Sequence, residues 1–196
     1  MKKIIEKLKK FEKSINKSDR KKLYILVFLL RFLVLAVPLY WFMESSISIY
    51  YYELFQTHQV KFILDAFSVN SSIGKTYSLE NALLTPTIET SDYIIGIDRA
   101  CTGYRSMFAL FSLILALPKI KWSKRLKGIF FGFAVLYLSN IIRISTTILL
   151  GLKYGEAVFN FAHTVLWREG LIILVLILWV LWIKLMVKKI DYKVWI

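Results

Sequence analysis

The sequence contains very little cysteine. Its 196 residues include a single one, Cys101, so no intramolecular disulfide can form. A thiol oxidoreductase normally uses a second, resolving cysteine, and its absence argues against that class of enzyme. Cysteine and histidine also do not occur at the spacings of a zinc site, so we expect neither a metal nor an organic cofactor.

Acidic residues are scarce too, because 13 Asp and Glu stand against 27 Lys and Arg, a formal net charge of +14. In a soluble protein this excess would suggest a nucleic-acid partner. Here ten basic residues lie within 1–22, five within 119–127 and four from 184 onward, whereas 44–100 holds only three, against seven acids. This positive-inside pattern predicts that both termini and the 119–127 loop are cytoplasmic, and it calls for no nucleic acid.

Long polar stretches are few, since 57% of the residues are hydrophobic. A bilayer core about 30 Å thick needs roughly 20 apolar helical residues to cross it. Four segments come near this length, at 23–43, 103–118, 128–150 and 163–186. We therefore predict an all-α, multi-pass protein of the cell membrane with about four transmembrane helices. The first apolar run is too long for a cleaved signal peptide and should remain as an anchor.

Two further segments have their own patterns. Residues 1–22 predict a basic amphipathic helix on the anionic lipids of the inner leaflet. The outer loop 44–102 predicts a surface helix up to residue 67 and a small β-hairpin from 87–90 and 93–97. No internal repeat is present, which argues against a transporter, and 23–196 is predicted to form one membrane-embedded domain.

Polar residues within apolar runs cost free energy and are candidates for function. Cys101 lies just before the apolar run at 103–118, so we expect a helix N-terminus that lowers the pKa of its thiol. Arg105 follows four residues later and would add positive potential on the same helical face. The alternative for Cys101 is a small buried hydrophobic residue.

Arg143 and His163 are the other two candidates. Arg143 lies inside the third predicted span, three residues after Asn140 and with no acid in that span, although such an arginine can also extend to the interface. His163 begins the fourth predicted span, where an interfacial role is the alternative. Counted from the cytoplasmic ends at about 1.5 Å per residue, Cys101, Arg143 and His163 lie about 26, 22 and 31 Å up their helices. We expect these side chains to meet near the outer face.

This set of residues resembles the exosortase/archaeosortase family of membrane cysteine transpeptidases. Cys101-Thr102-Gly103 resembles the family's Cys-Ser/Thr-Gly motif, Asn140-Ile141-Ile142-Arg143 resembles its Asn-x-x-Arg motif, and His163 opens the last core helix as in exosortases. The resemblance covers about residues 94–186. Many members have about eight spans, so this chain would be a compact version. Some archaeal members carry Arg at the third catalytic position, which leaves Arg168 as a rival to His163.

The resemblance implies a cysteine-type protease or transpeptidase that cuts a C-terminal sorting tail of exported proteins and passes the new C-terminus to a membrane or envelope acceptor. It implies Cys101 as nucleophile, His163 as proton carrier and Arg143 as oxyanion stabiliser. Asn140, Arg105 and Arg168 are supporting candidates, and the resemblance carries no catalytic role onto Arg105. Water, a lipid amine or a sugar would release the acyl group. The rival hypothesis is a non-catalytic assembly protein whose intramembrane polar residues join helices.

Overall fold

The computed structural model describes residues 16–44, 49–77, 83–165 and 170–187. Most of the predicted basic segment 1–22, and the tail after residue 187, therefore lie outside the described residues. The elements in chain order are α2 (Lys17–Glu44), α3 (Tyr50–Ala66), β1 (Ser72–Tyr77), β2 (Leu84–Glu89), β3 (Ile94–Gly96), the 3₁₀ turn η1 (Arg99–Thr102), α4 (Tyr104–Ala116), α5 (Trp122–Tyr154), α6 (Glu156–Thr164), α7 (Leu171–Trp182) and a terminal π turn (Ile183–Val187).

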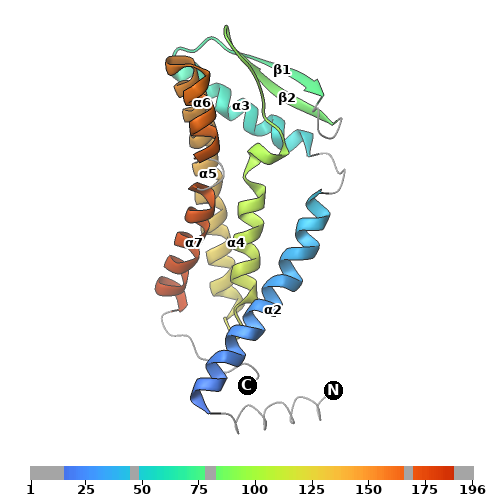
Figure 1. The fold of residues 1–196 in the computed structure, drawn as a ribbon, viewed down its shortest axis with the longest axis vertical. Helices are drawn as coiled ribbons and strands as arrows, with labels where there is room; N and C mark the ends of the chain where they lie inside the picture. Colours follow the sequence, from blue (N-terminus) through green and yellow to red (C-terminus); the bar gives the residue numbers. More distant parts are fainter. Residues whose placement is uncertain (1–15, 45–48, 78–82, 166–169, 188–196) are drawn as a thin grey trace.

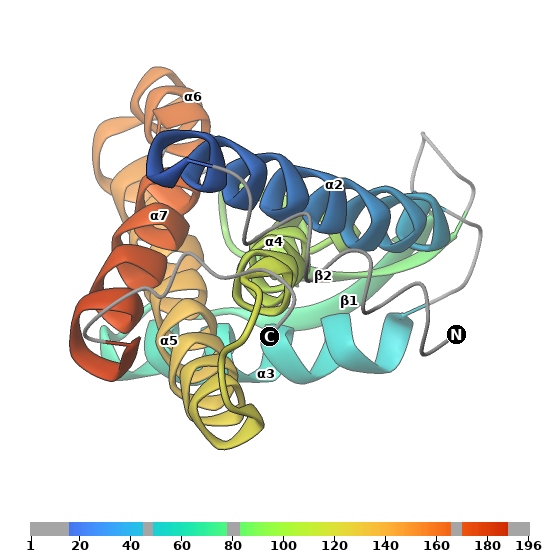
Figure 2. The same ribbon diagram turned by 90° about the horizontal axis from the view of Figure 1, so that it is seen from below.

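Four apolar helices form a bundle along the long axis of the molecule (Figure 1). Seen from below, α4 lies between α2, α5 and α7 (Figure 2), and it contacts all three. Their shared core includes Leu110, Ile114, Leu136, Val175 and Trp182, all at most 9% exposed. Outward-facing apolar side chains such as Val34 and Phe130 are exposed, as expected of helices that face lipid.

Among the described residues, two helices are long and apolar enough to cross a membrane, over Ser18–Trp41 and Trp122–Tyr154. The first overlaps the predicted span 23–43, and the second contains the predicted span 128–150. The helices Tyr104–Ala116 and Leu171–Met186 are apolar but shorter. At about 1.5 Å per residue, α4 is only about 20 Å long. The number of membrane crossings stays a prediction.

The predicted fourth span, 163–186, includes parts of two elements, and residues 166–169 between them lie outside the described residues, so where this span begins stays a prediction. His163 belongs to α6, and the next apolar helix, α7, starts at Leu171. α5 ends at Gly155, whose φ of +87° is readily adopted by glycine but not by other residues. The chain reverses there, and α6 packs back against α5.

A small α/β layer covers the upper end of the bundle in Figure 1. The strands are antiparallel in the order β1-β2-β3, and α3 packs against β2. The β2–β3 pair lies where the sequence pattern predicts a hairpin. β1 is not expected from the sequence, because Ser72 and Gly74 are residues typical of loops. A second core of Val60, Leu64, Ile88, Ile97 and Ile148 joins this layer to α5.

Arg125 connects α4 to α5 at the opposite end. Its guanidinium donates to the carbonyl oxygens of Leu115 (2.5 Å) and Leu117 (2.6 Å), and its Nε donates to that of Ile120 (3.0 Å). The last carbonyls of a helix have no partner within that helix, so these bonds satisfy the end of α4. Arg125 therefore has a structural role beyond its contribution to the positive-inside pattern.

Candidate active site

Cys101 lies in the short turn η1, between the sheet and α4. Asp98 caps this turn, because its Oδ1 accepts the backbone N–H of Cys101 at 3.0 Å. Gly103 then adopts φ +70° and ends the turn, and α4 begins at Tyr104. A Cβ on Gly103 would lie 2.9 Å from Cγ of Asn140, so glycine is required both by its backbone conformation and by the close approach of α5.

The carbonyl of Cys101 is held by two side chains of α5. Asn140 Nδ2 and Arg143 Nη2 each donate to this oxygen at 3.0 Å. Arg143 Nη2 also donates to Asn140 Oδ1 at 2.9 Å. Residues three apart share a helix face, which is why both reach one acceptor. Asn140 and Arg143 therefore face the same way, as their spacing predicts, and both hold the cysteine segment.

Gln56 of α3 completes this network, and sequence reasoning missed it. Its side-chain amide donates to the carbonyl of Thr102 at 3.1 Å, and its Oε1 lies 3.4 Å from Asn140 Nδ2. Both Gln56 and Asn140 have no exposed surface. The only sequence signal was a glutamine within a stretch already expected to be a helix. The turn that carries Cys101 is thus fixed by two helices distant in sequence.

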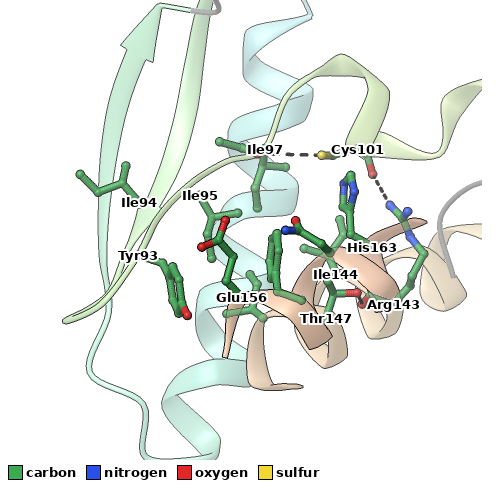
Figure 3. A pocket seen from close by; sticks show the side chains of 14 residues that line it. Tyr93, Ile94, Ile95, Ile97, Cys101, Arg143, Ile144, Thr147, Glu156 and His163 are labelled. Atoms are coloured by element: carbon green, nitrogen blue, oxygen red, sulfur yellow. Dashed lines mark hydrogen bonds between the residues drawn. The ribbon is translucent and has the colours of Figure 1, made fainter. Parts of the chain in front are cut away.

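A cavity of about 470 Å³ opens beside Cys101. It is bounded by strand β3, by the buried face of α5 and by α6. Figure 3 shows Arg143 and His163 directed toward the cavity from different helices, close to Cys101. The structure therefore brings the three residues Cys101, Arg143 and His163 to one cavity, as the depth count predicted.

The position of His163 depends on an aromatic stack. Its ring stacks on Phe159 with centroids 5.9 Å apart, and Phe159 stacks on Tyr93 at 6.4 Å. The three rings form one wall of the cavity between α6 and β3. Tyr93 and Phe159 had no role in the sequence-based predictions, since apolar and aromatic residues are frequent throughout the chain.

The electrostatics of Cys101 contradict the expected low thiol pKa. Burial, followed by the Asp98 carboxylate, raises the pKa of the Cys101 thiol well above its ordinary value, and Arg143 opposes this only in part. The prediction was wrong because Cys101 does not lie at the start of α4. Its own N–H is already bonded to Asp98, and the negative charge of that cap disfavours a thiolate.

A second carboxyl group is buried near this turn. Glu53 on α3 is 5% exposed, and burial together with Asp98 raises its pKa to about 7, while Arg99 opposes the shift. Glu53 was also missed, because its sequence neighbours indicate only a helix with a polar side. It adds a group close to Asp98 that titrates near neutral pH.

One supporting candidate lies elsewhere. Arg105 is exposed on α4 and lines a separate groove together with Phe32 and Tyr40 of α2. It does not share a helix face with Cys101, because Gly103 separates the two elements. Arg168 falls outside the described residues. Within the described part of the chain, no three His, Cys, Asp or Glu side chains are grouped to hold a metal ion.

The comparisons with known proteins show the family of the chain. The family described as transmembrane exosortase (Exosortase_EpsH) matches residues 18–183, which is most of the chain. No curated protein and no solved structure matches it. The matched range contains the cysteine turn, the Asn140–Arg143 pair, His163 and nearly all of the four apolar helices. This chain therefore belongs to the transmembrane exosortase family and is a membrane protein.

Proposed function

We propose that this protein is a membrane cysteine protease or transpeptidase that cleaves a C-terminal sorting signal of exported proteins. Membership of the exosortase family suggests a sorting role at the membrane. The specific proposal rests on the observation that Cys101, Arg143 and His163 line the same cavity. A nucleophile, a proton carrier and a cation are the three groups that acyl transfer requires.

The reaction begins from a protonated thiol, since the pKa of Cys101 is raised. His163 takes the proton as the sulfur attacks the scissile carbonyl carbon. The carbonyl oxygen becomes an oxyanion, which the Arg143 guanidinium stabilises. When the C–N bond breaks, His163 returns the proton to the leaving amine and the acyl group remains on Cys101 as a thioester. A water molecule, a lipid amine or a sugar hydroxyl then attacks the thioester and restores the thiol.

Arg143 has a geometry suited to both positioning and stabilisation. A guanidinium carries five N–H donors, and the bonds to Cys101 and Asn140 both come from Nη2. The cation therefore holds the backbone of the nucleophile while lining the cavity in which the oxyanion develops. Asn140 acts through Arg143 and through the Cys101 carbonyl, so we assign it a positioning role.

The test is a mass-spectrometric search for an acyl adduct on Cys101. Purified protein would be mixed with a C-terminal tail peptide from an exported protein of the same cells that is processed in vivo. We expect an adduct in the wild type, none in Cys101→Ala, and adduct formation slowed about 10²–10³-fold in Arg143→Ala and at least about 10²-fold in His163→Ala.

His58→Ala is the matched control, because His58 is the other histidine and is exposed on α3 away from the cavity lining. It should leave the adduct unchanged. Cleavage of the tail by Cys101→Ala would refute the proposal. A complete lack of adduct and cleavage would favour the non-catalytic assembly role, in which the buried polar residues only join helices.

A further inference from the structure

Strand β3 has one open edge, and this edge faces the cavity of the active site. Among the described strands, β3 pairs only with β2, at the end of the order β1-β2-β3. All five residues from Tyr93 to Ile97 line the cavity that Cys101 also lines. An edge strand presents backbone N–H and C=O groups that another extended chain can bond.

The register of β3 against β2 shows which residues direct their backbone N–H and C=O groups toward the open edge. Ile97 N–H donates to the carbonyl of Pro86 at 2.9 Å, and the Tyr93 carbonyl accepts from Thr90 N–H at 2.9 Å. Backbone bonding to one neighbour alternates along an antiparallel strand. Tyr93, Ile95 and Ile97 therefore bond toward β2, whereas Ile94 and Gly96 direct their N–H and C=O groups away from it.

The thiol gives independent support for this assignment. Cys101 Sγ lies 3.9 Å from the carbonyl oxygen of Gly96 (Figure 3), so that carbonyl does point away from β2. The open edge thus runs from Ile94 to the nucleophile itself. His163 and Phe159 lie across the cavity from this edge, and their rings stack on each other. Tyr93, next to the end of β3 that is farther from Cys101, stacks on Phe159.

We propose that the recognition segment of the sorting tail binds as an added strand along the open edge of β3. Its backbone bonds the N–H and C=O groups of Ile94 and Gly96, which leads the scissile carbonyl to Cys101. This inference rests on the proposed function and specifies its substrate as an extended polypeptide segment. Main-chain bonds supply affinity in strand addition, and alternate side chains supply specificity. Every second side chain of the segment faces the Tyr93–Phe159–His163 wall.

The first experiment measures binding to the full-length Cys101→Ala protein in detergent. The probes are the in vivo processed tail peptide and a series in which one backbone amide at a time is N-methylated. Strand addition predicts a loss that alternates with position, about tenfold at every second amide of the recognition segment and little at the amides between. Equal losses at consecutive positions, or no loss at any position, would overturn the inference.

The second experiment changes the edge itself. Ile94→Pro removes one outward N–H and no bond to β2, a position at which an edge strand tolerates proline. Its matched control is Ile94→Ala, which keeps the N–H and removes only an exposed side chain. We expect Ile94→Pro to weaken tail binding about tenfold and Ile94→Ala to change it little. Equal binding by both variants would contradict strand addition, and the N-methyl series decides the question should Ile94→Pro fail to fold.

The outcomes separate this inference from the proposed function. Acyl-adduct formation without an alternating N-methyl pattern would support the proposed enzymatic function and rule out strand addition. Binding losses that alternate along the N-methyl series, without any adduct in the wild type, would support strand addition and rule out the catalytic proposal. A tail that neither binds nor reacts overturns both.

Discussion

Asp98 both fixes the backbone of Cys101 and disfavours ionisation of its thiol. The carboxylate accepts the Cys101 N–H and thereby fixes the turn, while its charge raises the pKa of the neighbouring thiol. A resting thiol that stays protonated is protected from oxidation, because the thiolate is the reactive form. The proposed reaction therefore requires a base at the moment of attack, and His163 lines the same cavity.

Asp98→Asn tests this effect, since asparagine caps helical turns as well as aspartate but carries no charge. Removing the negative charge lowers the pKa of Cys101 and raises the thiolate fraction at a given pH. We expect faster alkylation of Cys101 by iodoacetamide at pH 8, with the rate in both proteins rising from pH 7 to 9. Asp92→Asn, in the exposed turn between β2 and β3, is the control and should leave the rate unchanged. An unaltered rate in Asp98→Asn would show that its charge does not act on the thiol.

The site residues that the sequence identified are polar residues in or beside apolar runs, whereas those that it missed lie in segments of mixed polarity. Cys101, Asn140 and Arg143 are polar groups in or beside apolar runs, where an unexplained polar residue is conspicuous. Gln56 and Asp98 lie in mixed segments, and their partners are backbone groups of the cysteine turn. For Gln56 that partner is 46 residues away, so no local pattern could reveal it.

At the scale of elements, the buried guanidinium of Arg125 holds the end of α4 against the start of α5. Arg125→Lys keeps the charge but loses the planar fork that reaches several carbonyls at once. We expect the free energy of unfolding to fall by roughly 2–4 kcal/mol, because hydrogen bonds from charged groups contribute about 1.5–3 kcal/mol each. The measurement is reversible unfolding in mixed detergent. Lys127→Ala, exposed on the same helix, should change it by less than about 0.5 kcal/mol, and an equal effect of both changes would argue against this role.

Helix α3 carries the carboxyl group whose titration should set the pH dependence of stability. Folding raises the pKa of Glu53 from its ordinary value of 4.5 to about 7. The folded state therefore binds this proton more tightly, and the stabilisation is complete below pH about 4.5 and is lost as pH rises through 7. We expect the melting temperature of the wild type to fall between pH 5 and 8. Glu53→Gln should flatten this decline, and an identical decline in the variant would exclude Glu53 as its source.

Element prediction succeeded where hydrophobic pattern alone decides the structure. The long apolar runs gave α2 and α5, and α3 lies where a surface helix was expected. The pattern failed where tertiary contacts decide. β1 forms because its residues pair with β2, despite the turn-forming Ser72 and Gly74.

At the scale of the whole molecule, the distribution of charge predicts that the sheet and the active site face outward. Single cysteines at Lys75 in β1 and at Lys127 in α5, both exposed, would test this in a Cys101→Ser background. A membrane-impermeant maleimide applied to intact cells should label Lys75→Cys alone, and cell lysis should add Lys127→Cys. Labelling of Lys127→Cys in intact cells would show that the topology is the reverse of the predicted one and that the cavity faces the cytoplasm.

The contact between Gln56 and Asn140 also has a consequence for how such sequences diverge. Both amides are fully buried, and together they hold the carbonyls of Thr102 and Cys101. A change at one position leaves the other amide without its partner in an interior where that is costly. Substitutions at these two positions are therefore expected to appear together across related sequences, so that position 56 covaries with the Asn-x-x-Arg motif although it belongs to a different helix.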